Sequence, residues 1–447
     1  MVKCWGTRAR ISQRMDRQLT AAAGPDLRSK LPKRQPRSLT VSMFFCAISL
    51  FTLSWDVFGN FEIGSLNLKI SALGFVLAMV TSGQSNPLVV RSPAVQVVLR
   101  VSGALVLTLL VASLLSNHVS DALGQTGRVV IGAVVPFIGV VLSIRNTQDF
   151  ERCLTWFIRG MLAASLFGFY QLSAYYLHLP QLVEYTGESG GVGRIAAFSY
   201  EPATFGQMVL MGMAAVIALA KIRSVRVPVL VMSILIAAAL LANTRALLLT
   251  MPVFLLLAAP KVLSSRTRSR LFLFAVGSVY ILIVVLLVAP NALEFISSQF
   301  LSIFDPNEAS SNARRLTQYS IMLDMISENW LLGIGPGNLF YEVSTIDQNV
   351  FDGGASNEVV ANNIWLQAMS DGGIILAGLH IALVSFVGTK LYLARDDATR
   401  TFSAAWLALI LVSGLIGSDF YTPARWVLLA FACLASVNDV KSPTKLK

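Results

Sequence analysis

Long blocks of apolar residues with almost no charge recur along this chain from residue 39 to residue 438. An α-helix needs about 20 consecutive apolar residues to cross the hydrocarbon of a bilayer. Hydrophobic residues make up 55% of the chain and charged residues only 13%, whereas a soluble domain carries about 25% charged residues. Such a chain cannot cover itself with a solvated surface. The sequence therefore predicts an all-α polytopic membrane protein.

About twelve blocks can be drawn, so we expect about 12 transmembrane helices. The blocks lie near residues 39–57, 66–82, 95–115, 128–144, 154–178, 203–220, 225–242, 246–260, 270–289, 364–393, 403–417 and 422–438. We expect residues 1–38 and 439–447 to be tails, the first of them basic and disordered. Residues 39–438 then form the transmembrane domain, with one large outer loop at 290–363.

The distribution of Lys and Arg predicts the orientation, because these residues concentrate in cytoplasmic loops. Ten of them lie in residues 1–38, and twelve spans would leave 26 of the 35 on the side of the N-terminus and six on the other. We therefore expect both termini in the cytoplasm and the loop at 290–363 outside. With one span more or one span fewer, a loop rich in Lys and Arg would lie on the outer side of the membrane.

The net charge of +11 does not indicate nucleic-acid binding, because the basic residues flank apolar blocks and form no face interleaved with aromatics. The chain has only four cysteines and three histidines, which are too scattered for a metal site or a disulfide framework. We interpret the cysteines as structural.

Six arginines would lie on the outer side: Arg128, Arg194, Arg245, Arg314, Arg315 and Arg425. A guanidinium is permanently charged, and its planar fork matches phosphate oxygens in bidentate fashion. For Arg128 and Arg425 we favour local capping or headgroup pairing. Arg245 lies in a tight turn between two apolar helices, close to hydrocarbon depth, where a charge is usually functional.

Arg194 and Glu201 lie in the segment RIAAFSYEPATFGQ, residues 194–207. Pro202 suits the first turn of a helix, and Glu201 then sits at the positive end of the helix dipole. Glu201 is therefore either a capping residue or a carboxylate that serves as a base or binds a sugar hydroxyl.

The loop 290–363 contains an amphipathic stretch followed by GIGPGN, residues 333–338. Its apolar positions suit one helix face, either on the membrane or above a cavity: Leu316, Tyr319, Ile321, Met322, Met325 and Ile326. GIGPGN lacks the Lys and Ser or Thr of a phosphate-binding loop, so we interpret it as a turn that returns the chain to the membrane. Asn362 and Asn363 then open the tenth span.

In this order the segments resemble the superfamily of bacterial O-antigen polymerases and O-antigen ligases. The resemblance includes Arg194 before the Glu201-Pro202 pair, Arg245 in a turn between helices, and the large outer loop at 290–363. In that loop, Arg315 lies four residues before Tyr319 and the Gly-rich turn follows. The family's ligases have His where this chain has Asn362, and Asn cannot act as a base. This departure favours a polymerase.

The resemblance implies a glycosyltransferase-C-like fold in the bacterial inner membrane, with the active site facing the periplasm and no metal or organic cofactor. It implies polymerisation of undecaprenyl-diphosphate-linked repeat units into exopolysaccharide or O-antigen. Arg245 and Arg315 would hold the diphosphate, and Glu201 would be the candidate base. The substrate-binding candidates are Arg194, Arg314, Tyr319, Asn338, Asn362 and Asn363.

Two alternatives stay open at the level of the sequence. The chain could transfer finished glycan to lipid or protein, as a ligase does, or it could be a polysaccharide transporter or flippase. Twelve spans suit a transporter, but no internal repeat is visible and a transporter does not require a large acidic outer loop. The expected partners are the lipid-linked oligosaccharide, the membrane, and the flippase and chain-length regulator of the same pathway, with no nucleic acid.

Overall fold

The computed structural model describes residues 40–55, 60–63, 66–82, 92–180, 182, 188–189, 192–199, 201–242, 244–262, 311–344, 363–394, 396–415 and 420–438. The chain divides into two units, Met1–Thr40 and Val41–Lys447, and every element below belongs to the second. The predicted tails 1–38 and 439–447 and the predicted span 270–289 lie outside the described residues.

Five helical segments among the described residues are long and apolar enough to cross a membrane. They are α6 (Pro93–Leu115), α7 to α8 (Val119–Ser143), α9 (Thr147–Leu177), α10 (Pro202–Ile222) and α17 (Ile364–Leu393). Shorter helices with apolar sequences are α3 (Val41–Phe51), α4 (Ile70–Val80), α11 (Val229–Ala242), α12 (Arg245–Val262) and α19 (Pro423–Asn438). This arrangement is that of a polytopic helical membrane protein.

The remaining helices lie between these apolar helices. They are α15 (Ser311–Glu328), α16 (Leu339–Ser344), α18 (Asp397–Leu411) and the 3₁₀ turn η2 (Ser413–Leu415). The segment α7 to α8 is α7 (Val119–Val129), one π-helical turn η1 (Val130–Val134) and α8 (Val135–Ser143). The predicted block 128–144 therefore begins earlier, at Val119, because the amphipathic α7 continues into it.

Two short antiparallel hairpins depart from the all-α prediction. Strand β1 (Asn60–Ile63) pairs with β2 (Leu66–Lys69), and β3 (Glu188–Ser189) pairs with β4 (Val192–Gly193). The predicted span 66–82 therefore starts with a strand, and its helix α4 begins only at Ile70. The hairpin β3–β4 lies between α9 and α10.

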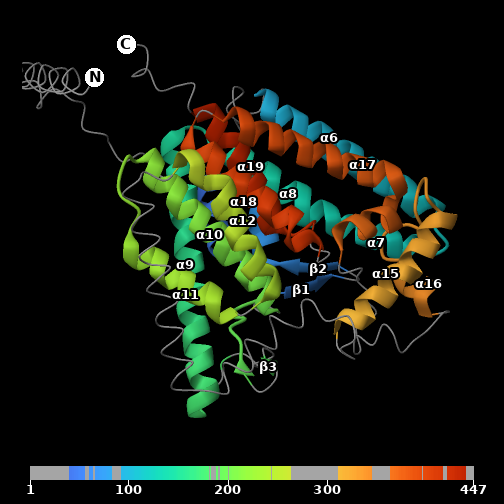
Figure 1. The fold of residues 1–447 in the computed structure, drawn as a ribbon. Coiled ribbons are helices and arrows are strands. Elements are labelled where there is room, and N and C mark those ends of the chain that lie inside the picture. The colour runs from blue at the N-terminus through green and yellow to red at the C-terminus, as the bar shows by residue number, and fades with distance from the viewer. Residues whose placement is uncertain are drawn as a thin grey trace, which may run out of the picture. The chain divides into compact units, whose positions relative to one another are not determined.

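Helix α10 is the central helix of the described bundle. In its most apolar stretch 83% of the residues are buried, against 28% to 44% in the other four long segments. It packs against α9, α11, α12, α18 and α19, and Figure 1 shows these helices crossing around it. Many side chains on other helices point outward instead: Leu230 is 74% exposed and Leu256 73%. Such apolar surface suits contact with lipid.

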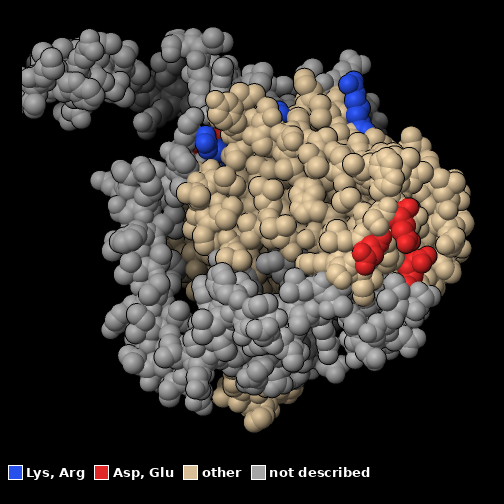
Figure 2. Space-filling view, turned by 45° about the vertical axis from the view of Figure 1, so that its right-hand side comes forward, with Lys and Arg blue, Asp and Glu red and all other residues tan. Residues whose placement is uncertain are grey.

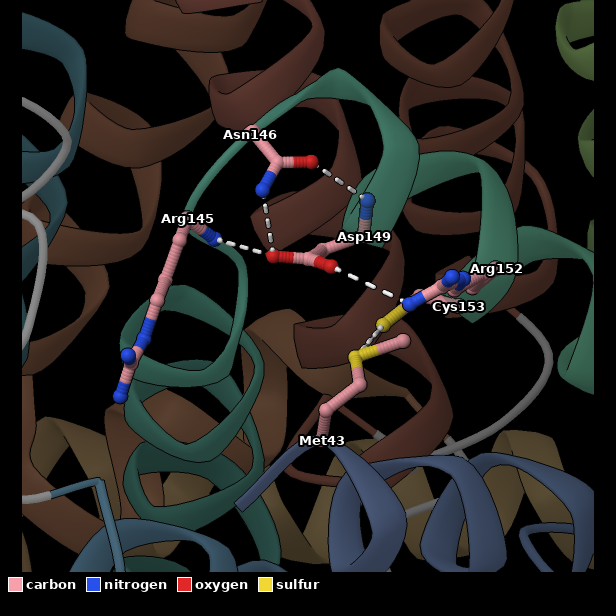
Figure 3. Close-up of polar contacts among 6 residues, drawn as sticks. All are labelled: Met43, Arg145, Asn146, Asp149, Arg152 and Cys153. Carbon is pink, nitrogen blue, oxygen red and sulfur yellow. Dashed lines mark hydrogen bonds and ion pairs between the residues drawn. The ribbon is translucent and has the colours of Figure 1, made fainter. Parts of the chain in front are cut away.

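Polar side chains define where α9 begins (Figure 3). The Asn146 side chain accepts a hydrogen bond from the Asp149 amide at 3.0 Å and donates one to the Asp149 carboxylate at 2.9 Å. Arg152 lies 3.9 Å from the other carboxylate oxygen. A capping side chain of this kind contributes about 1 kcal/mol. The helix ends at Leu177, and the φ of 52° at its C-cap residue His178 lies in the left-handed region.

Two ion pairs place three helix ends at the same end of the bundle. Arg223 after α10 pairs with Glu151 of α9 at 2.9 Å, and Lys221 of α10 pairs with Asp397 of α18 at 3.0 Å. The start of α9, the end of α10 and the start of α18 therefore lie together. The opposite ends of these helices carry the candidate site.

Candidate functional site

A short segment after β4 places Arg194 beside the turn between α11 and α12. The Ile195 amide donates to the Leu241 carbonyl at 3.1 Å, and Arg194 Nε donates to the Ala242 carbonyl at 3.4 Å. Behind this segment, the Gln171 side chain of α9 accepts a hydrogen bond from the Ala197 amide at 3.0 Å. The half-buried Arg194 thus lies at the end of α11, next to the turn that carries Arg245.

The first turns of α10 lie against the same turn. Glu201 is the N-cap residue, it is exposed, and its side chain makes no capping hydrogen bond. Pro202 occupies the first helical position, as predicted. A Cβ added to Gly206 would lie 3.5 Å from Thr244 Oγ1. The positive end of the α10 dipole therefore lies close to the α11–α12 turn and is not capped by the Glu201 side chain.

Arg245 is the first residue of α12, directly after Thr244. The Leu247 amide donates to the Thr244 carbonyl at 3.0 Å, which closes the first turn. The Arg245 side chain lies outside the described part of the chain, but its backbone lies in the turn that both Arg194 and α10 approach. The structure thus brings together the backbones of Arg194, Glu201 and Arg245, which are far apart in sequence.

A buried pair of residues that are far apart in sequence joins α10 to α19. Arg425 is 0% exposed, and its Nη2 donates to Oε1 of Gln207 at 2.8 Å. Headgroup pairing at Arg425, one of the two roles expected for it, is wrong because its guanidinium is buried in the protein. The only signal in the sequence was an Arg at the start of an apolar block.

Helix α15 carries Arg314, Arg315 and Tyr319. The Tyr319 hydroxyl donates to the Leu415 carbonyl of η2 at 3.3 Å, whereas the two arginine side chains lie outside the described residues. Met322 and Ile326 are buried, and this face of α15 contacts Leu366 and Met369 of α17. The predicted amphipathic face therefore packs on the start of α17.

The Gly-rich segment 333–338 forms the predicted turn. Gly333, Gly335 and Gly337 all have positive φ, which only glycine adopts without strain. Asn338 is 1% exposed, and its amide nitrogen donates to the Ile334 carbonyl at 2.7 Å. Asn338, a substrate-binding candidate from the sequence, is thus packed inside the turn.

The turn fits against a break in α17. Gly372 and Gly373 have non-helical dihedral angles within this helix. The Ile334 amide donates to the Ser370 carbonyl and the Ile374 amide donates to the Trp330 carbonyl, both at 2.8 Å. Backbone groups released by the break thus find partners in the turn, as irregular backbone at membrane depth requires.

Asn363 is the N-cap residue of α17, and its side-chain oxygen accepts from the amides of Trp365 at 2.9 Å and Leu366 at 3.2 Å. Asn362 lies outside the described residues. A Cβ added to Gly414 of η2 would lie 2.5 Å from the Ile364 side chain. The start of α17 therefore contacts η2, which also accepts the Tyr319 hydrogen bond.

The candidate residues thus form two groups at one end of the bundle. The first surrounds the start of α10, and the second surrounds η2 and the start of α17. Helix α12, which begins at Arg245, also contacts η2 and so connects them. In the described part of the chain, no group of three or more His, Cys, Asp or Glu side chains could hold a metal ion.

The fold and this arrangement define a class of protein: a multi-pass helical membrane protein with arginine-bearing segments gathered at one end. Residues 229–381, about a third of the chain, match the family model described as O-antigen ligase. The predicted resemblance to the superfamily of O-antigen ligases and polymerases is therefore confirmed over residues 229–381, and the match supports glycan processing of that type. No curated protein matches the chain.

The matched segment contains most of the candidate residues but not all of them. Arg245, Arg314, Arg315, Tyr319, Asn338, Asn362 and Asn363 lie within it. Arg194, Glu201 and Arg425 lie outside it, and they join it in space around the start of α10.

Proposed function

We propose that this protein polymerises undecaprenyl-diphosphate-linked oligosaccharide repeat units into a surface polysaccharide, either exopolysaccharide or O-antigen. The observation that carries the proposal is the convergence of Arg194 and the Arg245 turn on the start of α10. Guanidinium groups and a helix N-terminus both favour bound phosphate oxygens. A diphosphate headgroup at this end of the bundle matches that chemistry.

The proposed reaction joins two lipid-linked units. An acceptor hydroxyl oxygen forms a bond to the anomeric carbon of the growing chain's reducing-end sugar. The bond from that carbon to the diphosphate oxygen breaks, and undecaprenyl diphosphate leaves with the electron pair. Glu201, exposed at the start of α10, would take the hydroxyl proton. Arg245 and Arg315 would stabilise the charge that develops on the leaving diphosphate, with Arg194 and Arg314 in support.

The second group would bind the sugars. Tyr319 and Asn363 lie beside η2 and present a phenol and an amide, which suit hydrogen bonds to hydroxyl groups. Because the Asn363 oxygen caps α17, its amide nitrogen is the group we assign to the substrate. Asn362 would act with it.

The orientation in the membrane is part of the proposal. We place this end of the bundle at the periplasmic face of the inner membrane and both termini in the cytoplasm. The charges support this placement. Figure 2 shows Lys and Arg toward the top, a broad uncharged area, and Asp and Glu gathered toward the lower right. The ion-paired end with Lys221 and Arg223 is then cytoplasmic, as the loop charges predict.

Ligase activity is the second candidate, and the description of the matching family model favours it. A ligase would transfer finished glycan to lipid or protein by the same attack on a lipid-diphosphate donor. Against it stands Asn362, an amide at the position where the family's ligases have His. We therefore prefer polymerisation, in which Glu201 takes the proton.

Gel analysis of the host's polysaccharide tests the proposal. Deleting the gene should leave single repeat units, whereas loss of a ligase would leave long lipid-linked chains. Complementation with Arg245→Lys or Arg315→Lys keeps the positive charge but loses the planar, bidentate guanidinium. We expect the amount of long-chain polysaccharide to fall by at least about tenfold. Arg223→Lys, at the opposite end, is the matched control and should restore wild-type chains. Normal chains from both site variants would disprove the assignment.

A further inference from the structure

Arg425 carries a charge that its position alone does not explain. A long basic side chain near the end of a membrane helix usually extends its head to the interface. Arg425, in the first turn of α19, is instead 0% exposed and donates to Gln207 of α10 at 2.8 Å. Charged side chains inside a membrane bundle are costly and usually functional.

Gln207 lies in the part of α10 that approaches the candidate site. The preceding residue, Gly206, packs against Thr244, directly before Arg245. The Phe205 amide donates to the Glu201 carbonyl at 3.1 Å, so Glu201 belongs to the same continuous stretch of helix. A hydrogen bond at Gln207 therefore fixes the rotation and the depth of the helix end that carries Glu201.

We propose that Arg425 is a positioning residue of the diphosphate site: through Gln207 it holds the start of α10 against the Arg245 turn. This inference rests on the proposed function, and neither Gln207 nor Arg425 belongs to the segment that matches the family model. A charge-assisted hydrogen bond is stronger and more directional than a neutral one, which suits a contact that aligns two helices. The ligand class is a polyprenyl diphosphate.

A double substitution separates positioning from mere stability. Arg425→Met with Gln207→Leu removes both polar partners and keeps similar volumes, a change that can be nearly neutral for folding. We expect the double variant in lipid nanodiscs to keep its thermal unfolding midpoint. Its affinity for farnesyl diphosphate, measured by calorimetry, should fall about tenfold. Gln207→Leu alone should show the same loss.

Controls make each outcome decisive. The variant Ser42→Ala with Ser143→Ala removes another buried interhelical hydrogen bond, of 2.8 Å, between α3 and α8, and should bind like wild type. Farnesyl monophosphate should bind weakly to every variant. Wild-type affinity for the diphosphate in both Gln207 variants would overturn the inference.

The proposed function fails in a distinguishable way. If the wild-type protein does not discriminate farnesyl diphosphate from the monophosphate, or if Arg245→Ala binds it as tightly as wild type, the diphosphate site itself is wrong. If Arg245→Ala loses binding and the two Gln207 variants do not, only the role of Arg425 is wrong.

Discussion

Single side chains attach the segment 311–344 to the long apolar helices, and Tyr341 of α16 is the best defined. Its hydroxyl donates a hydrogen bond to the Asp121 carboxylate of α7, and its ring stacks on His118 with ring centroids 3.9 Å apart. A Cβ added to Gly337 would lie 2.5 Å from the Gln125 side chain. The corner between α6 and α7 thus holds one side of the Gly-rich turn, while α17 holds the other.

The hydrogen bond to Asp121 raises the pKa of the Tyr341 hydroxyl above its ordinary value of 10.0. A raised pKa means that the protonated phenol is favoured in the folded protein. The contact therefore contributes fully below pH 10 and is lost as the pH rises through the folded-state value. Asp121→Asn should lower the pKa of Tyr341 toward 10.0.

Carbon-13 NMR of labelled tyrosine measures this pKa, with Tyr341→Phe to assign the signal. A Tyr341 that titrates identically in the wild type and in Asp121→Asn would contradict the contact.

At the scale of elements, the broken helix α17 is the feature that joins the segment 311–344 to the bundle. At Gly373, φ is 64° and ψ is −159°, and a Cβ there would lie 2.2 Å from the Leu331 carbonyl oxygen. Both the dihedral angles and the close approach require glycine. The glycine doublet therefore lets the turn at 330–334 pack directly on the helix that Asn363 begins.

Gly373→Ala should loosen this contact and reduce polymer formation. The strained backbone alone costs about 1–3 kcal/mol, so the thermal unfolding midpoint should fall together with the yield of long chains. Gly378→Ala is the matched control, because it lies five residues further along α17 and a Cβ there meets nothing within 4 Å. Equal behaviour of the two variants would show that the docked turn is unimportant.

At the scale of the whole molecule, the sequence locates some of the described helices closely and others less so: the predicted span 403–417 begins and ends six residues later than α18. It misses the interruptions within helices. The block 364–393 coincides with α17, and 422–438 differs from α19 by one residue at its start. Hydropathy averages over a window, so it finds these segments. The same average did not reveal the break at Gly372 and Gly373, because two glycines barely change it.

Only the part of the candidate site that lies in recognisable motifs could be predicted from the sequence. Motif order identified Arg194, Glu201 and Arg245, and the structure brings their backbones together. Arg425 was misinterpreted, because a basic residue at the start of an apolar block has the same pattern whether it faces headgroups or another helix. Only the contact with Gln207 distinguishes these cases.

Reporter fusions test the proposed orientation of the bundle. A periplasm-active phosphatase inserted after residue 290 should be active, and the same enzyme fused after residue 438 should be inactive. The reason is the excess of Lys and Arg on the side of the termini. A cytoplasmic signal from the position after 290 would remove the proposed function, since lipid-linked repeat units would be on the other side.

Helices α18 and α19 have only 15 and 16 residues. At about 1.5 Å per residue they extend about 22–24 Å, less than the hydrocarbon thickness of about 30 Å. Most of their described residues are buried, so other helices rather than lipid surround them. On the proposed function, a site at their ends would lie below the membrane surface, where a diphosphate headgroup would bind while its polyprenyl tail stays in the leaflet.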